Sequence, residues 1–144
     1  PTISDPGSLL INKIYEAKDN GLEVNINVIP GGTALTSALS LSGFFGNQFT
    51  FYGFLPNKKG RETIFKEISE NNKISIFYES VHRIEKCIES LEKILGDSRK
   101  VVVAKELTKI HEKVVRGSIY EVKKYFEENK DKIKGEFVII IDGN

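Results

Sequence analysis

The chain has 144 residues and a formal net charge of +1 at neutral pH, so its total charge gives no indication of nucleic-acid binding. Hydrophobic residues make up 40% and charged residues 28%, which is typical of a globular protein, and no apolar run is long enough to span a bilayer. The single cysteine, Cys87, excludes an internal disulfide and a cysteine-based zinc site, and we expect a reducing, cytoplasmic location.

The N-terminal part of the sequence predicts a helix and then a strand. Asp5 and Pro6 suit a helix start, and apolar residues share one face as far as Ala17. Residues 22–28 then alternate between apolar and polar, which predicts a half-buried strand. A helix followed by a strand is the tail of a β-α-β pattern, so the sequence indicates a fragment that lacks the first strand of its domain.

Two glycines occur in the next segment, residues 30–34, before a helix of small residues. Glycines at such a turn let a ligand approach the backbone, but a plain tight turn capped by Thr33 explains them as well. The segment is no P-loop, because the Lys-Ser/Thr ending is missing. Glycines up to Gly46 end the helix, so we predict a first domain that ends with residues 1–46 and a second domain in 47–144.

The second predicted domain alternates between strands and helices, which indicates an α/β fold. Strands are expected at 48–54, from Ile74 to the polar residues that start at Glu79, and at 100–104, 112–117 and 136–142. Helices are expected at 61–69, at 84–95 and after a capping box at Ser118 and Glu121. The strand at 100–104 is continuously apolar and is expected inside the sheet, whereas 112–117 is expected at an edge.

Two of these strands end abruptly in polar side chains. The strand that starts at Ile74 runs into Glu79, His82 and Arg83, and the strand at 100–104 runs into residues 105–109. Ligands of open α/β sheets bind at the carboxyl ends of strands. A cleft is therefore predicted if the loops 30–34, 78–83 and 105–109 gather at one edge of the sheet.

Each of these polar groups also has a purely structural interpretation. Glu79 suits a general base, or an ion pair with Arg83 or Lys105. His82 and Arg83 suit phosphate binding, or the solvated first turn of a helix. Glu106 suits a site or an ordinary surface pair with Lys109. With only two histidines and no suitable carboxylate spacing, the sequence predicts no metal site.

Six short motifs, in this order and at this spacing, resemble those of one known family. They are Ile3-Ser4-Asp5-Pro6-Gly7, Ile29-Pro30-Gly31, Tyr52-Gly53-Phe54-Leu55-Pro56, Phe77-Tyr78-Glu79-Ser80-x-His82-Arg83, Glu106-Leu107-Thr108-Lys109 and Lys134-Gly135-Glu136. The resemblance is to the ribosomal RNA small-subunit methyltransferase I family of the tetrapyrrole (corrin/porphyrin) methylase superfamily. Val81 and Lys105 depart from it, since a proline and an arginine are usual there; lysine keeps the charge but loses bidentate phosphate recognition.

The resemblance implies a fold and a reaction. The expected fold is α/β and tetrapyrrole-methylase-like, with the end of a first α/β domain and a second α/β domain that has a mixed sheet. The expected activity is S-adenosylmethionine-dependent 2′-O-methylation of a cytidine in 16S rRNA, by a homodimer. Methylation of a tetrapyrrole carbon, or a fragment that folds but binds neither ligand, are the alternatives.

The resemblance also assigns residues to roles. The cofactor is expected at Pro30, Gly31, Gly32, Thr33, Ala34, Tyr78, Glu79, Leu107, Thr108, Gly135 and Glu136. RNA is expected at Lys58, Lys59, Arg61, His82, Arg83, Lys105 and Lys109. Glu79 and Glu106 are the candidates for a general base.

Overall fold

The computed structural model describes residues 2–143, in two compact units that divide between Gly32 and Thr33. The first unit contains α1 (Gly7–Asp19), which confirms the predicted helix. The predicted strand at 22–28 is wrong, because these residues have no regular secondary structure. A strand needs a neighbour to receive its backbone hydrogen bonds, and no strand among residues 2–143 pairs with this segment.

The second unit holds the remaining elements, and its predicted strands and helices are confirmed. They are α2 (Ala34–Ser42), β1 (Phe49–Phe54), α3 (Arg61–Glu70), β2 (Ile74–Ser80), α4 (Ile84–Leu95), β3 (Lys100–Lys105), β4 (Lys113–Ser118), α5 (Ile119–Glu128), a 3-10 turn (Lys130–Lys132) and β5 (Glu136–Ile141). None of the described helices is long and apolar enough to cross a membrane.

The five strands form one mixed sheet in the order β1-β2-β5-β3-β4. β1 and β2 are parallel, whereas β5 is antiparallel to both of its neighbours, β2 and β3. β2 and β3 therefore run in the same direction, and their carboxyl ends meet where β5 begins. The register shows this directly, since Ser80 lies opposite Glu136 and Lys105 lies opposite Phe137. β3 lies inside the sheet and β4 at an edge, as predicted.

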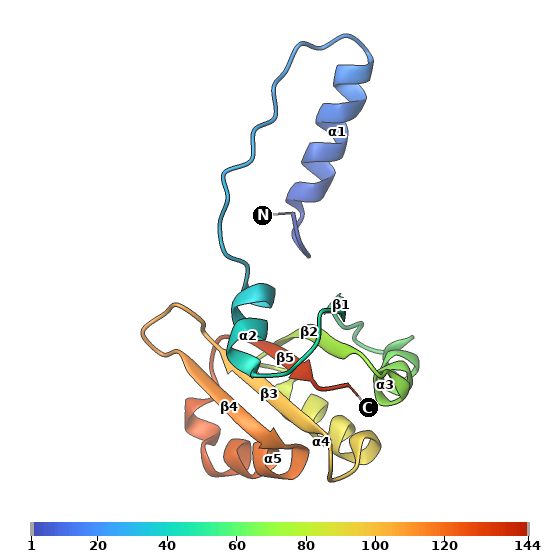
Figure 1. Cartoon of the computed structure of the whole chain (residues 1–144). Coiled ribbons are helices and arrows are strands. Elements are labelled where there is room, and N and C mark those ends of the chain that lie inside the picture. Colours follow the sequence, from blue (N-terminus) through green and yellow to red (C-terminus); the bar gives the residue numbers. More distant parts are fainter. Residues whose placement is uncertain (1, 144) are drawn as a thin grey trace. The chain divides into compact units, whose positions relative to one another are not determined.

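Helices cover both faces of the sheet (Figure 1). The first apolar cluster joins α3, α4 and α5 to residues such as Phe77 and Ile139, and the second joins α2 to residues such as Ile76 and Ile140. Neighbouring strand residues alternate between the two clusters because side chains alternate along a strand. Cys87 is fully buried in α4, as predicted, and its burial raises the pKa of the thiol to about 12.

The short helix α2 is defined by its ends. Thr33 caps it, since its hydroxyl accepts a hydrogen bond from the Thr36 N–H at 3.2 Å, and Gly43 ends it in the left-handed conformation with φ 66°. Leu35 and Ala38 are buried against the sheet. Helix α2, which the predicted boundary at residue 46 assigned to the first domain, therefore packs with the strands of residues 47–144. That boundary itself stays a prediction.

Candidate functional site

The loops that follow β1, β2 and β3 lie together at the carboxyl ends of these strands, where the turn that precedes β5 also lies. This end of the sheet, hereafter the edge, is not an edge strand. Phe54 at the end of β1 lies opposite Tyr78, and the Glu106 N–H donates to the Glu136 carbonyl at 3.3 Å. The structure thus brings together two of the three predicted loops, 78–83 and 105–109. Of the third, Thr33 and Ala34 start α2, and residues 30–32 belong to the first unit.

Tyr78 connects this edge to the start of α2. Its hydroxyl accepts a hydrogen bond from the Leu35 N–H at 3.2 Å. Phe51 and Phe54 contact its ring edge-on, with centroids 5.0 and 5.3 Å away. Burial raises the pKa of Tyr78, so the hydroxyl keeps its proton at neutral pH. Leu107 packs on the same face of the sheet, and the start of α2, Tyr78 and Leu107 therefore share one side.

Glu79 points to the opposite face and is fully buried. Its Oε2 lies 2.7 Å from Arg61 Nη2 and its Oε1 lies 2.7 Å from Arg83 Nε, while the Ser80 N–H donates to Oε1 at 2.9 Å. The predicted ion pair with Arg83 is confirmed; Lys105 instead donates to a backbone carbonyl, that of Lys132, at 2.7 Å. Because both oxygens already accept from donors, these contacts argue against proton abstraction by Glu79, and its catalytic role stays a prediction.

Both arginines continue from Glu79 to the loop after β1. Arg83 Nη1 donates to the Leu55 carbonyl at 3.1 Å and contacts the Asn57 side chain, and Arg61 Nη1 donates to the Pro56 carbonyl at 3.3 Å. Only 13% of the Arg61 side chain and 26% of the Arg83 side chain are exposed. These predicted RNA ligands are therefore largely occupied by contacts within the protein.

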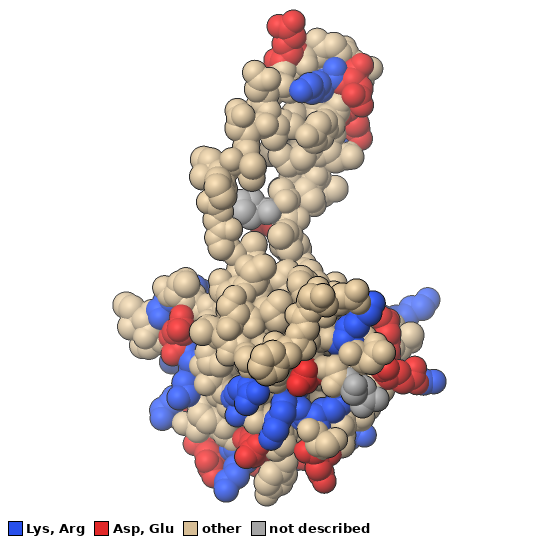
Figure 2. Space-filling model, viewed as in Figure 1, with Lys and Arg blue, Asp and Glu red and all other residues tan. Residues whose placement is uncertain are grey.

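Four of the other predicted RNA ligands differ from the two arginines in exposure. Lys58, Lys59, His82 and Lys109 are exposed, and all four lie in loops at the same edge of the sheet. On the face seen in Figure 2, lysines and arginines are interspersed with acidic residues over the unit that starts at Thr33. Any basic site must therefore be local, as the net charge of +1 already indicated.

Glu106 links two of the motifs through its carboxylate. Its Oε1 accepts from Lys109 Nζ at 3.0 Å and from the Glu136 N–H at 3.2 Å. The hydrogen bond from Lys109, followed by that from Glu136, lowers the pKa of Glu106. The predicted surface pair with Lys109 is thereby confirmed, and the role of Glu106 as a base stays a prediction.

Gly135 is required by this contact. Its backbone has φ 86°, and a Cβ atom there would overlap the Glu106 carboxylate. Glu106 and Thr108 themselves have positive φ, 49° and 65°, and the Thr108 N–H donates to Glu112 Oε2 at 2.6 Å. The motifs at 106–109 and 134–136 are therefore joined by hydrogen bonds through Glu106, although they lie far apart in the sequence.

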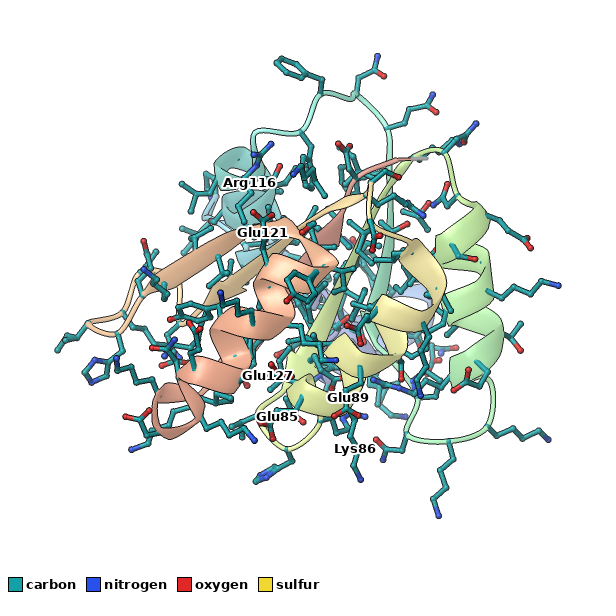
Figure 3. The ribbon with its side chains drawn as sticks, turned by 90° about the horizontal axis from the view of Figure 1, so that it is seen from below. Glu85, Lys86, Glu89, Arg116, Glu121 and Glu127 are labelled. Atoms are coloured by element: carbon teal, nitrogen blue, oxygen red, sulfur yellow. The ribbon has the colours of Figure 1, made fainter. Side chains whose placement is uncertain are left out.

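Contacts on the remaining surface are structural in character. Arg116 of β4 donates to the Ser42 carbonyl at 2.8 Å and so fastens the end of α2 (Figure 3). On the outer side of α4 and α5, where Figure 3 labels acidic residues of both helices, Lys123 pairs with Glu92 at 2.7 Å. Residues 2–143 contain no group of three or more His, Cys, Asp or Glu side chains arranged to hold a metal ion.

Sequence reasoning missed two residues of this edge, Asn57 and Glu112. The Asn57 side chain contacts Arg83, which lies 26 positions later in the sequence. Glu112 accepts a hydrogen bond from the backbone N–H of Thr108. The contact of Asn57 has no local signal, because it depends on the packing of β1 beside β2. Glu112 lies four residues after Thr108, a spacing that suits a loop hydrogen bond.

The sequence matches the model of the tetrapyrrole (corrin/porphyrin) methylases over residues 1–123. The chain belongs to this family. The predicted resemblance is confirmed, since the chain is similar to proteins named ribosomal RNA small subunit methyltransferase I. The Thermotoga maritima protein is 39% identical over 143 residues, which are 99% of this chain and 61% of that protein. The Escherichia coli O157:H7 protein is 37% identical and matches 100% of this chain over 49% of its own length.

Solved structures support the fold alone. The methyltransferase CobJ superposes with a TM-score of 0.66 at 17% identity, covering 99% of this chain and 61% of CobJ. The cobalt precorrin-4 methyltransferase CbiF gives 0.65 at 15% identity, covering 95% of this chain and 59% of CbiF. These likenesses confirm the tetrapyrrole-methylase-like α/β fold. The chain spans roughly half to three fifths of the length of the curated relatives compared above.

Proposed function

We propose that the protein transfers a methyl group from S-adenosylmethionine to the 2′-oxygen of a cytidine in 16S rRNA. The proposal is carried by similarity over nearly the whole chain to proteins named for the small-subunit RNA, at 37–39% identity. The geometry is consistent with it, because the matching motifs at 77–83, 106–109 and 134–136 meet at one edge of the sheet. The likeness to CobJ and CbiF concerns the fold alone.

The residues present fit the proposed cofactor in kind. When bound, S-adenosylmethionine supplies an electrophilic methyl group on a sulfonium. The positive dipole end of α2 suits a carboxylate, and the partly exposed rings of Tyr78 and Phe54 suit a cation. We therefore assign the cofactor to the α2 side of the sheet in the second unit, with Thr33, Ala34, Tyr78 and Leu107, and with Thr108, Gly135 and Glu136. The cofactor role of residues 30–32 and of Glu79 stays a prediction from the resemblance.

Exposed lysines and a histidine at the same edge suit the phosphates of RNA. Lys58, Lys59, His82 and Lys109 are the accessible members of the predicted set, and phosphate contacts fix the register of a nucleic acid. Arg61, Arg83 and Lys105 each donate to a backbone carbonyl of the protein. We therefore propose that Arg61 and Arg83 contribute to RNA binding mainly through the loop that they hold.

Methyl transfer to a ribose oxygen needs alignment of the two reacting groups and removal of one proton. Glu79 and Glu106 are the proposed candidates to accept that proton, and the binding of Glu79 by two guanidinium groups favours Glu106. Alignment of the two reacting groups beside the joined motifs at 106–109 and 134–136 would lower the entropic part of the barrier. A cytoplasmic homodimer completes the proposal, and light scattering of the full-length protein tests its mass.

Methyl transfer by the full-length protein tests the proposed activity. The protein is incubated with S-adenosylmethionine labelled in its methyl group and either small ribosomal subunits or a tetrapyrrole precursor. We expect label in 16S rRNA at a nucleotide that resists alkaline cleavage, because 2′-O-methylation removes the internal nucleophile. Label in the tetrapyrrole, or on an RNA base, would overturn the proposal. RNA incubated with cofactor but without protein is the control.

A further inference from the structure

We propose that Glu79 is a positioning residue which acts through Arg61 and Arg83 on residues 55–60, hereafter the 55–60 loop. The three side chains form a clamp that fixes this loop so that Lys58 and Lys59 face RNA phosphates. The inference rests on the proposed function for its RNA part, whereas the clamp itself rests on contacts within the chain.

The clamp is built from one buried anion between two cations. Each oxygen of the Glu79 carboxylate binds a different guanidinium at 2.7 Å, so the carboxylate sets the position of both arginines at once. Arg61 is further oriented by Phe65, whose ring centroid lies 4.9 Å below the guanidinium. Arg83 Nε also donates to Ser80 Oγ at 3.3 Å. Neither guanidinium is therefore free to rotate.

The far side of each guanidinium holds the 55–60 loop. The two arginines bind the successive carbonyls of Leu55 and Pro56, and Arg83 also contacts Asn57. The loop closes with the Arg61 N–H donating to the Lys58 carbonyl at 3.2 Å. Its backbone is therefore fixed on both sides of the lysine pair.

Lys58 and Lys59 project from this fixed backbone into solvent. Both are exposed, and among residues 2–143 neither of them forms an ion pair. The clamp thus uses its own charges internally and presents two others. A backbone that is ordered before binding loses less entropy on binding than a flexible one, which favours affinity for a ligand.

The burial of Glu79 indicates that its charge does more than stabilise the fold. A carboxylate with 0% exposure is costly unless it is paired, and an apolar residue at this position would extend the core that includes Phe77. Such a residue would leave both arginines without the anion that orients them. The charge is therefore explained by its effect on the arginines and, through them, on the loop.

The test measures the loop and RNA binding separately in the full-length protein. Glu79→Gln keeps the size of the side chain but removes its charge, and Asn57→Ala removes one loop contact at an exposed position where folding is not at risk. Glu62→Gln, which neutralises an exposed glutamate in α3, is the matched control. Trypsin cleavage after Lys58 and Lys59 under native conditions reports opening of the loop, and urea unfolding reports global stability.

We expect both clamp variants to be cleaved at the loop about tenfold faster than the parent and Glu62→Gln, since cleavage follows local opening. Binding to a 16S rRNA fragment is then titrated against salt. Replacing Lys58 and Lys59 by alanine should lower the salt slope by about 1.4, the value for two phosphates of a single strand. Adding Glu79→Gln to that double variant should change the affinity by less than about twofold. Glu79 acts on RNA binding through the two lysines, so its effect is lost when they are absent and the substitutions are not additive.

Two results would overturn the inference. One is loop cleavage of Asn57→Ala and Glu79→Gln at the parent's rate. The other is an equal loss of RNA affinity on Glu79→Gln with and without the two lysines, which would place Glu79 outside the effect of the loop. If the parent binds no RNA, the proposed function is overturned, and trypsin cleavage alone decides whether the clamp exists. If Glu79→Gln does not fold, Asn57→Ala decides.

Discussion

Glu79 and Arg99 are the two charged residues that are buried in the described part of the chain, and they lie at opposite ends of the sheet. Glu79 lies near the carboxyl end of β2 and is bound by two arginines. Arg99 precedes β3 and donates only to backbone carbonyls, those of Ile68, Ser69, Asn71 and Asp142. One buried charge is thus neutralised by side chains, and the other is solvated by the backbone.

The difference shows how burial of a charge serves two purposes. Arg99 joins the C-terminal end of α3 to the residue after β5, and the carbonyls at a helix C-terminus favour a cation. Burial lowers the pKa of Arg99, but an arginine stays charged at neutral pH. Its three guanidinium nitrogens all donate to these carbonyls, so Arg99 itself offers no donor to a ligand. At the other end, the arginines bound by Glu79 extend to a loop with exposed lysines, so this end is available for a ligand.

The largest effect is expected from removing the buried cation. Arg99→Met should lower the free energy of unfolding by about 4 kcal/mol, because several buried carbonyls lose their donors. Urea unfolding measures this loss of stability. Arg99→Lys is the comparison variant, because lysine keeps the charge but lacks the several donors of the guanidinium group. If Arg99→Met were as stable as the parent, the stabilising role of the buried arginine at its end of the sheet would be contradicted.

A smaller loss is expected from neutralising the buried anion. Glu79→Gln should lower the free energy of unfolding by about 2 kcal/mol, since the amide replaces only part of the charged hydrogen bonding to Arg61 and Arg83. Glu62→Gln, measured in the same urea series, should lie within about 0.5 kcal/mol of the parent. A loss in Glu79→Gln that exceeds that in Arg99→Met would reverse the order of the two ends.

An exposed cap near Arg99 gives the next effect. Ser118 and Glu121 form the predicted capping box at the start of α5, with the Ser118 N–H donating to Glu121 Oε2 at 2.7 Å. Ser118→Ala should lower the free energy of unfolding by about 1 kcal/mol. The control is Ser90→Ala in α4, a half-buried serine whose hydroxyl donates to the Lys86 carbonyl within the helix, and no significant change in the urea midpoint is expected. Equal effects in both variants would remove the cap as their cause.

The smallest effect is local and depends on pH. Lys109 and the Glu136 N–H lower the pKa of Glu106 in the fold, so their stabilisation is present above the unfolded pKa of about 4.3 and is lost as the pH falls through the lower folded value. We expect hydrogen-exchange protection of the Glu136 amide to be constant from neutral pH to about pH 5 and to decrease in stronger acid. Glu106→Gln should abolish this dependence, and unchanged protection in acid would contradict the contact.

Much of the second unit follows from local patterns in the sequence. The buried stripe of α4 and the capping box of α5 depend on side chains within a few positions of one another, and such spacing is visible in any sequence. The strand predicted at 22–28 failed for the opposite reason. Its alternation is genuine, but a strand also needs a paired neighbour, and pairing is not a local property.

The motif at 77–83 was predicted to end a buried strand in polar groups, and the sequence alone determined that much. The sheet decided which of them point the same way: Tyr78 faces α2, whereas Glu79 faces the arginines. It also brought Gly135 against Glu106 and Asn57 against Arg83. Short-range periodicity fixes helices, strands and caps because their forces act between near neighbours. Partners of buried charges are chosen only when strands distant in sequence become adjacent, because desolvation and pairing act across the packed interior.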